Sequence, residues 1–106
     1  MTKRILLRPR ASQDLDDCFT HIAENDPKAA FEFFDAARLT IAQLSKMPGL
    51  GSLYRVNSPR LQGLRKWPVK DFRKYLIFYL DQDNCIEIIR ILYAARDLSS
   101  ILERER

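Results

Sequence analysis

The chain has 106 residues, with 18 Lys or Arg, 14 Asp or Glu and a formal net charge of +4. Hydrophobic residues make up 46% of it, and there are only 3 Gly and 5 Pro. This composition excludes a disordered or fibrous chain, and the length predicts a single domain over residues 1–106. Such a domain has room for a hydrophobic core but not for a large cofactor-binding fold, so we expect no cofactor.

Charge is segregated along the chain. The net charge is +4 over residues 1–10, −6 over residues 11–37, +8 over residues 38–75 and −2 over residues 76–106. A basic block as dense as residues 38–75 favours an anionic partner, either nucleic acid or an acidic protein. The alternative interpretation is an ordinary solvated surface.

The sequence has no export or membrane signal. The apolar run at residues 5–7 is too short for a signal peptide, and the longest apolar run, Tyr75–Leu80, is too short to span a bilayer. We therefore expect a cytoplasmic protein without membrane contact, in which Cys18 and Cys85 are reduced and buried. Two cysteines without a CxxC motif and a single His exclude the usual kind of zinc site, so no metal is expected.

The first half of the chain predicts a strand and a helical hairpin. Lys3–Arg8 has the composition of a short strand. Residues 11–25 follow a helical period with one apolar stripe: Leu15, Cys18, Phe19 and Ile22. The polar residues of this helix are expected to face solvent: Asp14, Asp16, Asp17, His21 and Glu24. Asp26 and Pro27 predict the start of a second helix that runs to about Lys46, and the short break predicts an antiparallel hairpin.

The second half predicts a sheet and a short terminal helix. Three segments have strand composition and are separated by polar turns: Leu61–Val69, Phe72–Leu80 and Cys85–Tyr93. Pro68 should lie at an edge or a bulge, and Asp97–Leu102 should form the terminal helix. The predicted fold class is α+β, with an N-terminal strand, a two-helix antiparallel hairpin, a three-stranded antiparallel sheet and a short C-terminal helix.

Both faces of the strongest strand are apolar, although one helical hairpin covers only one face. Alternation places Lys74, Leu76, Phe78 and Leu80 on one face and Arg73, Tyr75, Ile77 and Tyr79 on the other. We interpret the second face, aromatic and basic, as open and as the site of a partner. The alternative is that the N-terminal strand, the terminal helix and residues 53–60 cover it.

Catalytic motifs are mostly missing. There is no GxSxG, HExxH or Gly-rich phosphate loop, and His21 is more typical of a solvated helix residue than of a general base. Trp67, beside Arg65 and Lys66, fits either stacking on a base or packing on a strand. A ribonuclease that uses the 2′-hydroxyl needs cations, an acid and a base. The sequence supplies the cations but no evident acid–base pair.

The run from Gly63 to Asp97 resembles the RelE/ParE toxin superfamily of type II toxin–antitoxin systems, and its ParE-like branch in particular. The order and spacing of several further pieces extend the similarity over nearly the whole chain: Ala11…Asp14-Leu15, Ile22-Ala23…Asp26-Pro27, Leu44…Pro48…Gly51 and Arg90…Ala95-Arg96-Asp97. The resemblance implies the same α+β fold as the one predicted above.

The resemblance also implies a function. ParE-like toxins act on DNA gyrase without being enzymes, and a cognate acidic antitoxin of the ParD type neutralises them in a hetero-oligomer. Operator DNA is then contacted only through the antitoxin. The RelE-like branch instead cleaves mRNA in the ribosomal A site, and this remains the alternative. A third hypothesis is a decayed member that only binds its antitoxin and represses the shared operon.

Site residues follow from the resemblance together with the expected open face. The expected antitoxin contacts are Arg73, Tyr75, Ile77, Tyr79 and Arg90, and the expected target contacts are Arg65, Lys66, Trp67 and Arg96. No catalytic residue is expected for a ParE-like toxin. A ribonuclease would use Lys66, Arg73, Arg96 and Tyr93. This set is defective, because Pro68 and Tyr75 stand where the ribonuclease branch has basic residues. Tyr93 is a departure of a different kind, since ParE-like chains commonly have a His at this position.

Overall fold

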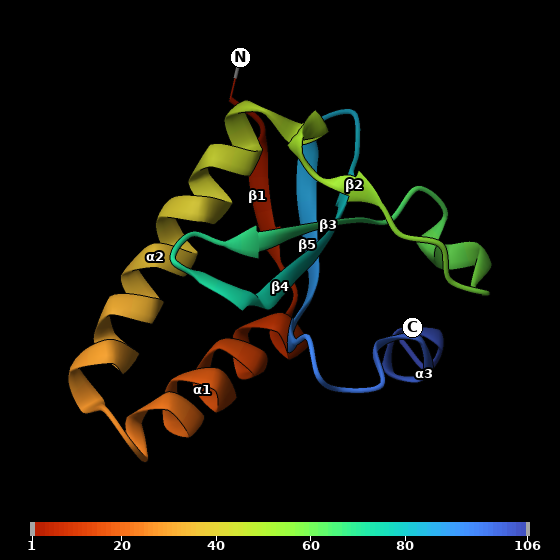
Figure 1. Ribbon diagram of the computed structural model, residues 1–106. Coiled ribbons are helices and arrows are strands. Elements are labelled where there is room, and N and C mark those ends of the chain that lie inside the picture. The colour runs from red at the N-terminus through yellow and green to blue at the C-terminus, as the bar shows by residue number, and fades with distance from the viewer. Residues whose placement is uncertain (1, 106) are drawn as a thin grey trace.

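A mixed five-stranded sheet forms the centre of the computed structural model, which describes residues 2–105 (Figure 1). The strand order is β1-β5-β4-β3-β2. The strands are β1 Arg4–Leu7, β2 Ser52–Leu53, β3 Arg65–Val69, β4 Phe72–Asp81 and β5 Cys85–Tyr93. The helices are α1 Pro9–Ala23, α2 Pro27–Lys46 and α3 Leu98–Glu103. Within residues 2–105, no helix is long and apolar enough to cross a membrane.

The α+β architecture is confirmed, but the predicted three-stranded sheet is too small. β1 joins the sheet in parallel with β5, from Arg4 opposite Cys85 to Leu7 opposite Ile88. At the other edge, the two-residue strand β2 pairs with β3. The helical hairpin connects β1 at one edge of the sheet to β2 at the other. Neither edge strand was predictable, because the partner of β1 lies far along the chain and a two-residue strand carries no periodic signal.

The helical hairpin forms largely as the sequence predicts. The Asp26 side chain accepts a hydrogen bond from the Ala29 amide, Pro27 takes the first turn of α2, and the helix ends at Lys46 just before Pro48. Helix α1 begins at Pro9, two residues before the predicted start, because proline suits a first helical turn that needs no amide donor.

The expected open face of the sheet is in fact the covered one. Ile77 and Tyr79 are fully buried and Tyr75 is 8% exposed. They pack against the apolar stripes of the hairpin: Leu15 and Cys18 of α1, and Phe33, Ile41 and Leu44 of α2. The open-face prediction is therefore wrong. Both faces of β4 are apolar, so alternation alone does not say which of them the hairpin covers.

The opposite face is covered by the C-terminal helix and the segment before β3. Phe78 and Leu80 of β4 pack there with Leu61, Leu64 and Leu102. Figure 1 shows the α1–α2 hairpin on one side of the sheet and α3 with the 54–64 segment on the other. The sheet therefore has a core on each face, and neither face of β4 is left open.

A β-bulge in β5 changes which residues share a face. Phe78 pairs with Arg90 but Tyr79 pairs with Ile88, so Ile89 is an extra residue. Ile88 and Ile91 consequently face the helical hairpin, whereas Ile89 faces α3. A strict alternation along β5 would place Ile88 and Ile91 on opposite faces, and the bulge is what brings them to the same one. The predicted irregularity at Pro68 is confirmed as a second register shift.

A buried phenol fixes the turn that follows α2. The Tyr79 hydroxyl donates to the Pro48 carbonyl at 2.7 Å and accepts from the Gly51 amide at 2.8 Å. Arg65 Nη1 donates to the Gly51 carbonyl at 2.6 Å. A Cβ at Gly51 would lie 2.5 Å from the phenol oxygen, so only glycine fits. Burial raises the pKa of Tyr79, outweighing the Gly51 hydrogen bond and the Arg65 charge, which lower it.

Candidate functional site

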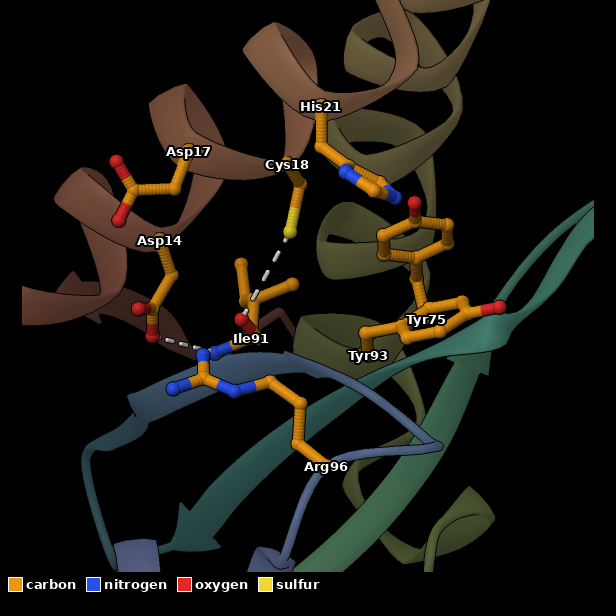
Figure 2. A pocket seen from close by; sticks show the side chains of 8 residues that line it. All are labelled: Asp14, Asp17, Cys18, His21, Tyr75, Ile91, Tyr93 and Arg96. Carbon is orange, nitrogen blue, oxygen red and sulfur yellow. Dashed lines mark hydrogen bonds between the residues drawn. The ribbon is translucent and has the colours of Figure 1, made fainter.

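A cleft of about 300 Å³ lies where α1 crosses the end of β5 (Figure 2). Its residues come from α1, β4, β5 and the following loop: Asp14, Asp17, Cys18, His21, Tyr75, Ile91, Tyr93 and Arg96. The α1 residues are three or four apart, so they share one helix face. Figure 2 shows His21 reaching from α1 towards the tyrosine rings, whereas the Cys18 sulfur points to the Ile91 carbonyl.

The cleft exists because β1 is shorter than its neighbour. β1 pairs with β5 only as far as Ile88, which leaves the rest of β5 at the sheet edge. Asp14 takes the place of a strand there, since its Oδ2 accepts a hydrogen bond from the Ile91 amide at 3.0 Å. A buried backbone donor requires such a partner. The α1 helix is thereby held along the free end of β5.

A buried ion pair stabilises this junction. Arg90 Nε and Nη2 donate to the two Asp14 oxygens at 2.7 and 3.0 Å, and Nη1 donates to Glu105 at 3.1 Å. Asp14 is 2% exposed and Arg90 4%. Burial lowers the pKa of Arg90, but hydrogen bonds and charge from Asp14, then Glu105, outweigh it and raise that pKa. The expectations of a solvated Asp14 and an antitoxin-binding Arg90 are therefore wrong, because each buries its charge against the other.

The cysteine in the cleft is not a nucleophile. Burial raises the pKa of Cys18 to about 12, and the charges of Asp14 and Asp17 add to this. The thiol is therefore protonated near neutral pH and unreactive. Both cysteines are free, and Cys85 is only partly buried, unlike the expectation for it.

The mouth of the cleft combines aromatic rings with a cation. The Tyr75 and Tyr93 rings lie 5.1 Å apart, and the His21 ring is 6.1 Å from Tyr93. Burial raises the pKa of Tyr75, with smaller contributions from Cys18 and Tyr93. The Arg96 amide donates to the Tyr93 carbonyl, while its exposed guanidinium makes no hydrogen bond or ion pair with the rest of residues 2–105. Nothing in that range forms a cluster suited to a metal ion.

The expected site residues do not form the expected surfaces. Of the antitoxin set, Ile77, Tyr79 and Arg90 are buried, Tyr75 lines the cleft, and Arg73 is exposed.

The four residues expected to contact the target also lie in different parts of the structure. Arg65 is tied to Gly51, and Trp67 packs partly buried beside the helix-side core. The Lys66 ammonium lies 5.3 Å from the centre of the Tyr54 ring, on the α3 side of the sheet, away from Arg96. Lys66 is therefore also separated from Tyr93 and Arg96, its partners in the ribonuclease set, whereas Arg73 borders a groove with Tyr93.

A second surface, missed by the sequence analysis, lies between β1 and α2. An apolar groove of about 650 Å³ is lined by Ile5, Leu7, Leu15, Asp35, Arg38, Leu39, Ile41 and Ala42. Leu39 is 71% exposed and Ile5 46%. β1 also forms an edge of the sheet, so its outward backbone groups have no strand partner within residues 2–105. The apolar run at residues 5–7 was the feature of the sequence that indicated this surface, because an apolar strand at the edge of a sheet needs another segment to cover it.

The chain is thus a small α+β protein with a sheet covered on both faces and two open hollows at its surface. A family model described as "ParE toxin of type II toxin-antitoxin system, parDE" matches residues 5–98. The chain therefore belongs to the ParE toxin family of type II toxin–antitoxin systems.

A solved structure agrees with this assignment at the level of the fold. The structure titled "Chromosomal ParDE TA system from P. aeruginosa" superposes with a TM-score of 0.70 at 17% identity. The match covers 87% of this chain and 96% of that one. Among curated protein sequences, none matches the chain significantly.

Proposed function

We propose that this protein is a cytoplasmic toxin that inhibits DNA gyrase and is neutralised by a cognate acidic antitoxin. The observation that carries the proposal is the family match, which spans residues 5–98 and thus both surfaces described above. The superposition on a chain from a ParDE system supports the same fold. Operator DNA would be contacted through the antitoxin.

We propose further that the toxin acts by binding and not by catalysis. A ribonuclease would need Lys66, Arg73, Arg96 and Tyr93 around one phosphate, but Lys66 projects on the α3 side of the sheet beside Tyr54. In the cleft, burial holds the Cys18 thiol protonated, and Asp14 is committed to Arg90. These features support a binding role, with RelE-like mRNA cleavage as the alternative.

The β1–α2 groove is the surface best suited to the antitoxin. Its floor is apolar, its edge strand has outward backbone groups without a strand partner among residues 2–105, and its lining includes the exposed Arg38 together with Asp35. An extended acidic segment with apolar side chains would satisfy all three features at once. This groove replaces the buried face of β4 as the proposed antitoxin site.

Expression of the chain without antitoxin tests the proposed target in cells. We expect growth arrest with an SOS response and gyrase–DNA cleavage complexes, and no cuts in mRNA at the ribosomal A site. A-site cuts with intact chromosomes would instead establish the RelE-like alternative. Absence of growth arrest would support a decayed member that only binds its antitoxin.

A further inference from the structure

Helix α2 has a second stripe of side chains, which faces away from the sheet. Its members are spaced so that they share one side of the helix, and none of them is buried: Phe31, Asp35, Arg38, Leu39 and Ala42. Leu39 is 71% exposed and Phe31 65%, the highest values among the large hydrophobic side chains of residues 2–105. Figure 1 shows α2 along one margin of the molecule. Exposed apolar side chains grouped in this way mark an interaction surface, which we call the α2 outer stripe.

The α2 outer stripe also contains one acid and one base that are free to bind a partner. Asp35 and Arg38 are exposed, and neither side chain forms a hydrogen bond or ion pair with another residue of the described chain. They lie between the two exposed apolar side chains, Phe31 and Leu39. A complementary partner must therefore place a base against Asp35 and an acid against Arg38, three residues away on the same helix side.

A second copy of the same stripe provides this match. In a contact with twofold symmetry, each residue pair between the copies occurs twice. When two α2 helices lie antiparallel with Asp35 opposite Arg38 of the second copy, the contact is centred between Ala36 and Ala37. The same centre places Phe31 opposite Ala42 of the second copy, an exposed ring against a small side chain. A single register thus satisfies the charged pair and the apolar pair together.

Like charges do not meet in this register. The other charged residues of α2 fall opposite uncharged residues of the second copy: Lys28 opposite Ser45, Glu32 opposite Ile41 and Lys46 opposite Pro27. The edge strand β1 offers no such match, because residues 1–10 contain four bases and no acid, and two β1 strands would bring like charges together. The helices, and not the edge strands, are therefore the self-complementary surface.

We infer that two copies of the chain associate through the α2 outer stripe, with their α2 helices antiparallel. The inference goes beyond the proposed function, since the association needs neither gyrase nor antitoxin. Arg38, Leu39 and Ala42 also line the β1–α2 groove. Self-association should therefore compete with the antitoxin for this groove, a consequence that rests on the proposed function.

Analytical ultracentrifugation of the purified chain alone tests the inference. We expect a monomer–dimer equilibrium with a dissociation constant in the micromolar range, as is typical of a small interface. Asp35→Arg and Arg38→Asp should each raise this constant at least about tenfold, because each places like charges opposite one another at two symmetric positions. Phe31→Ala should weaken the dimer without any change in charge.

The two charge reversals should also rescue each other, which separates a reciprocal contact from a general effect of charge. The double variant Asp35→Arg with Arg38→Asp should dimerise as the unaltered chain does, since it exchanges the two charges and preserves both pairs. An equimolar mixture of the two single variants should form heterodimers, because one has two bases at these positions and the other two acids. Asp16→Arg and Arg55→Asp, at exposed positions outside α2, are the matched controls and should leave the dissociation constant unchanged.

Three results would overturn the inference. They are a monomer at every concentration, a dimer that neither single reversal weakens, and failure of both the double variant and the mixture to restore dimerisation. Circular dichroism and urea unfolding of each variant establish that it is folded. Gyrase inhibition and antitoxin binding are measured separately, so that failure of the dimer and failure of the proposed function are distinguishable.

Discussion

Three residues in tight contact fix the turn between α2 and β3. The Tyr79 hydroxyl bonds to both Pro48 and Gly51, and the missing side chain of Gly51 makes room for the phenol. The sequence shows a glycine after a helix, but nothing in it indicates that a tyrosine 28 positions later fills the space. The chemistry of such long-range contacts becomes visible only in the folded structure.

Gly51→Ala tests this contact. The added Cβ would lie 2.5 Å from the phenol oxygen, and we expect the free energy of unfolding to fall by about 1–3 kcal/mol. Urea unfolding measures it. Gly49→Ala is the matched control, since nothing lies within 4 Å of its Cβ position. Equal stability of the two variants would contradict the proposed close packing.

The buried Asp14–Arg90 pair allows a second test. Asp14→Ala leaves the Arg90 guanidinium buried with Glu105 as its partner and also removes the acceptor for the Ile91 amide. We expect a loss of about 3–5 kcal/mol in unfolding free energy, typical of breaking a buried ion pair. Asp16→Ala, on the exposed side of α1, should be nearly neutral. If Asp14→Ala lowered the free energy of unfolding no more than an ordinary surface substitution does, the ion pair would not be needed for stability.

The buried thiol and phenols predict that the free energy of unfolding falls at alkaline pH. The pKa of Cys18 is raised from 9.0 to about 12, and burial also raises the pKa values of Tyr75 and Tyr79. The unfolded chain then loses these protons first, so stability that is present below about pH 9 falls as the pH rises towards 12. Urea unfolding against pH should show a shallower fall for Cys18→Ala than for the unaltered chain. Identical slopes would mean that this thiol is not the group responsible.

At the scale of elements, long segments with a clear periodicity were predictable. Very short strands, and strands that are apolar on both faces, were not. The bounds of α2 and of β5 follow closely from their caps, turns and composition. β2 has two residues, and the bulge at Ile89 shifts a strand whose residues are nearly all apolar. The covered face of β4 could not be inferred because both faces are equally apolar. The cleft was missed for a related reason, since Asp14 looks solvated until Arg90 is placed beside it.

The β1–α2 groove gives the prediction at this scale. Leu39→Asp places a charge in the groove at a side chain that is 71% exposed, so stability should change by less than about 0.5 kcal/mol. Binding of the antitoxin should weaken about tenfold or more, as for an apolar anchor at an interface. Isothermal titration with the purified antitoxin measures this. Leu53→Asp, on β2 at the other sheet edge, is the matched control. A stronger effect at Leu53 would place the antitoxin at that edge.

At the scale of the whole molecule, the chain combines a stable double-sided core with two separate open surfaces. The basic block of residues 38–75 favoured an anionic partner, either nucleic acid or an acidic protein. The apolar groove beside β1 suits a protein segment, and it shares no lining residue with the cleft between α1 and β5.

The most direct test of the account is a supercoiling and DNA-cleavage assay with purified gyrase. We predict that the chain inhibits supercoiling, increases gyrase–DNA cleavage complexes, and loses both effects when the antitoxin is added. The Leu39→Asp variant should remain inhibitory while escaping the antitoxin. Unaltered supercoiling and no cleavage complexes, together with mRNA cuts in a translating extract, would contradict the account.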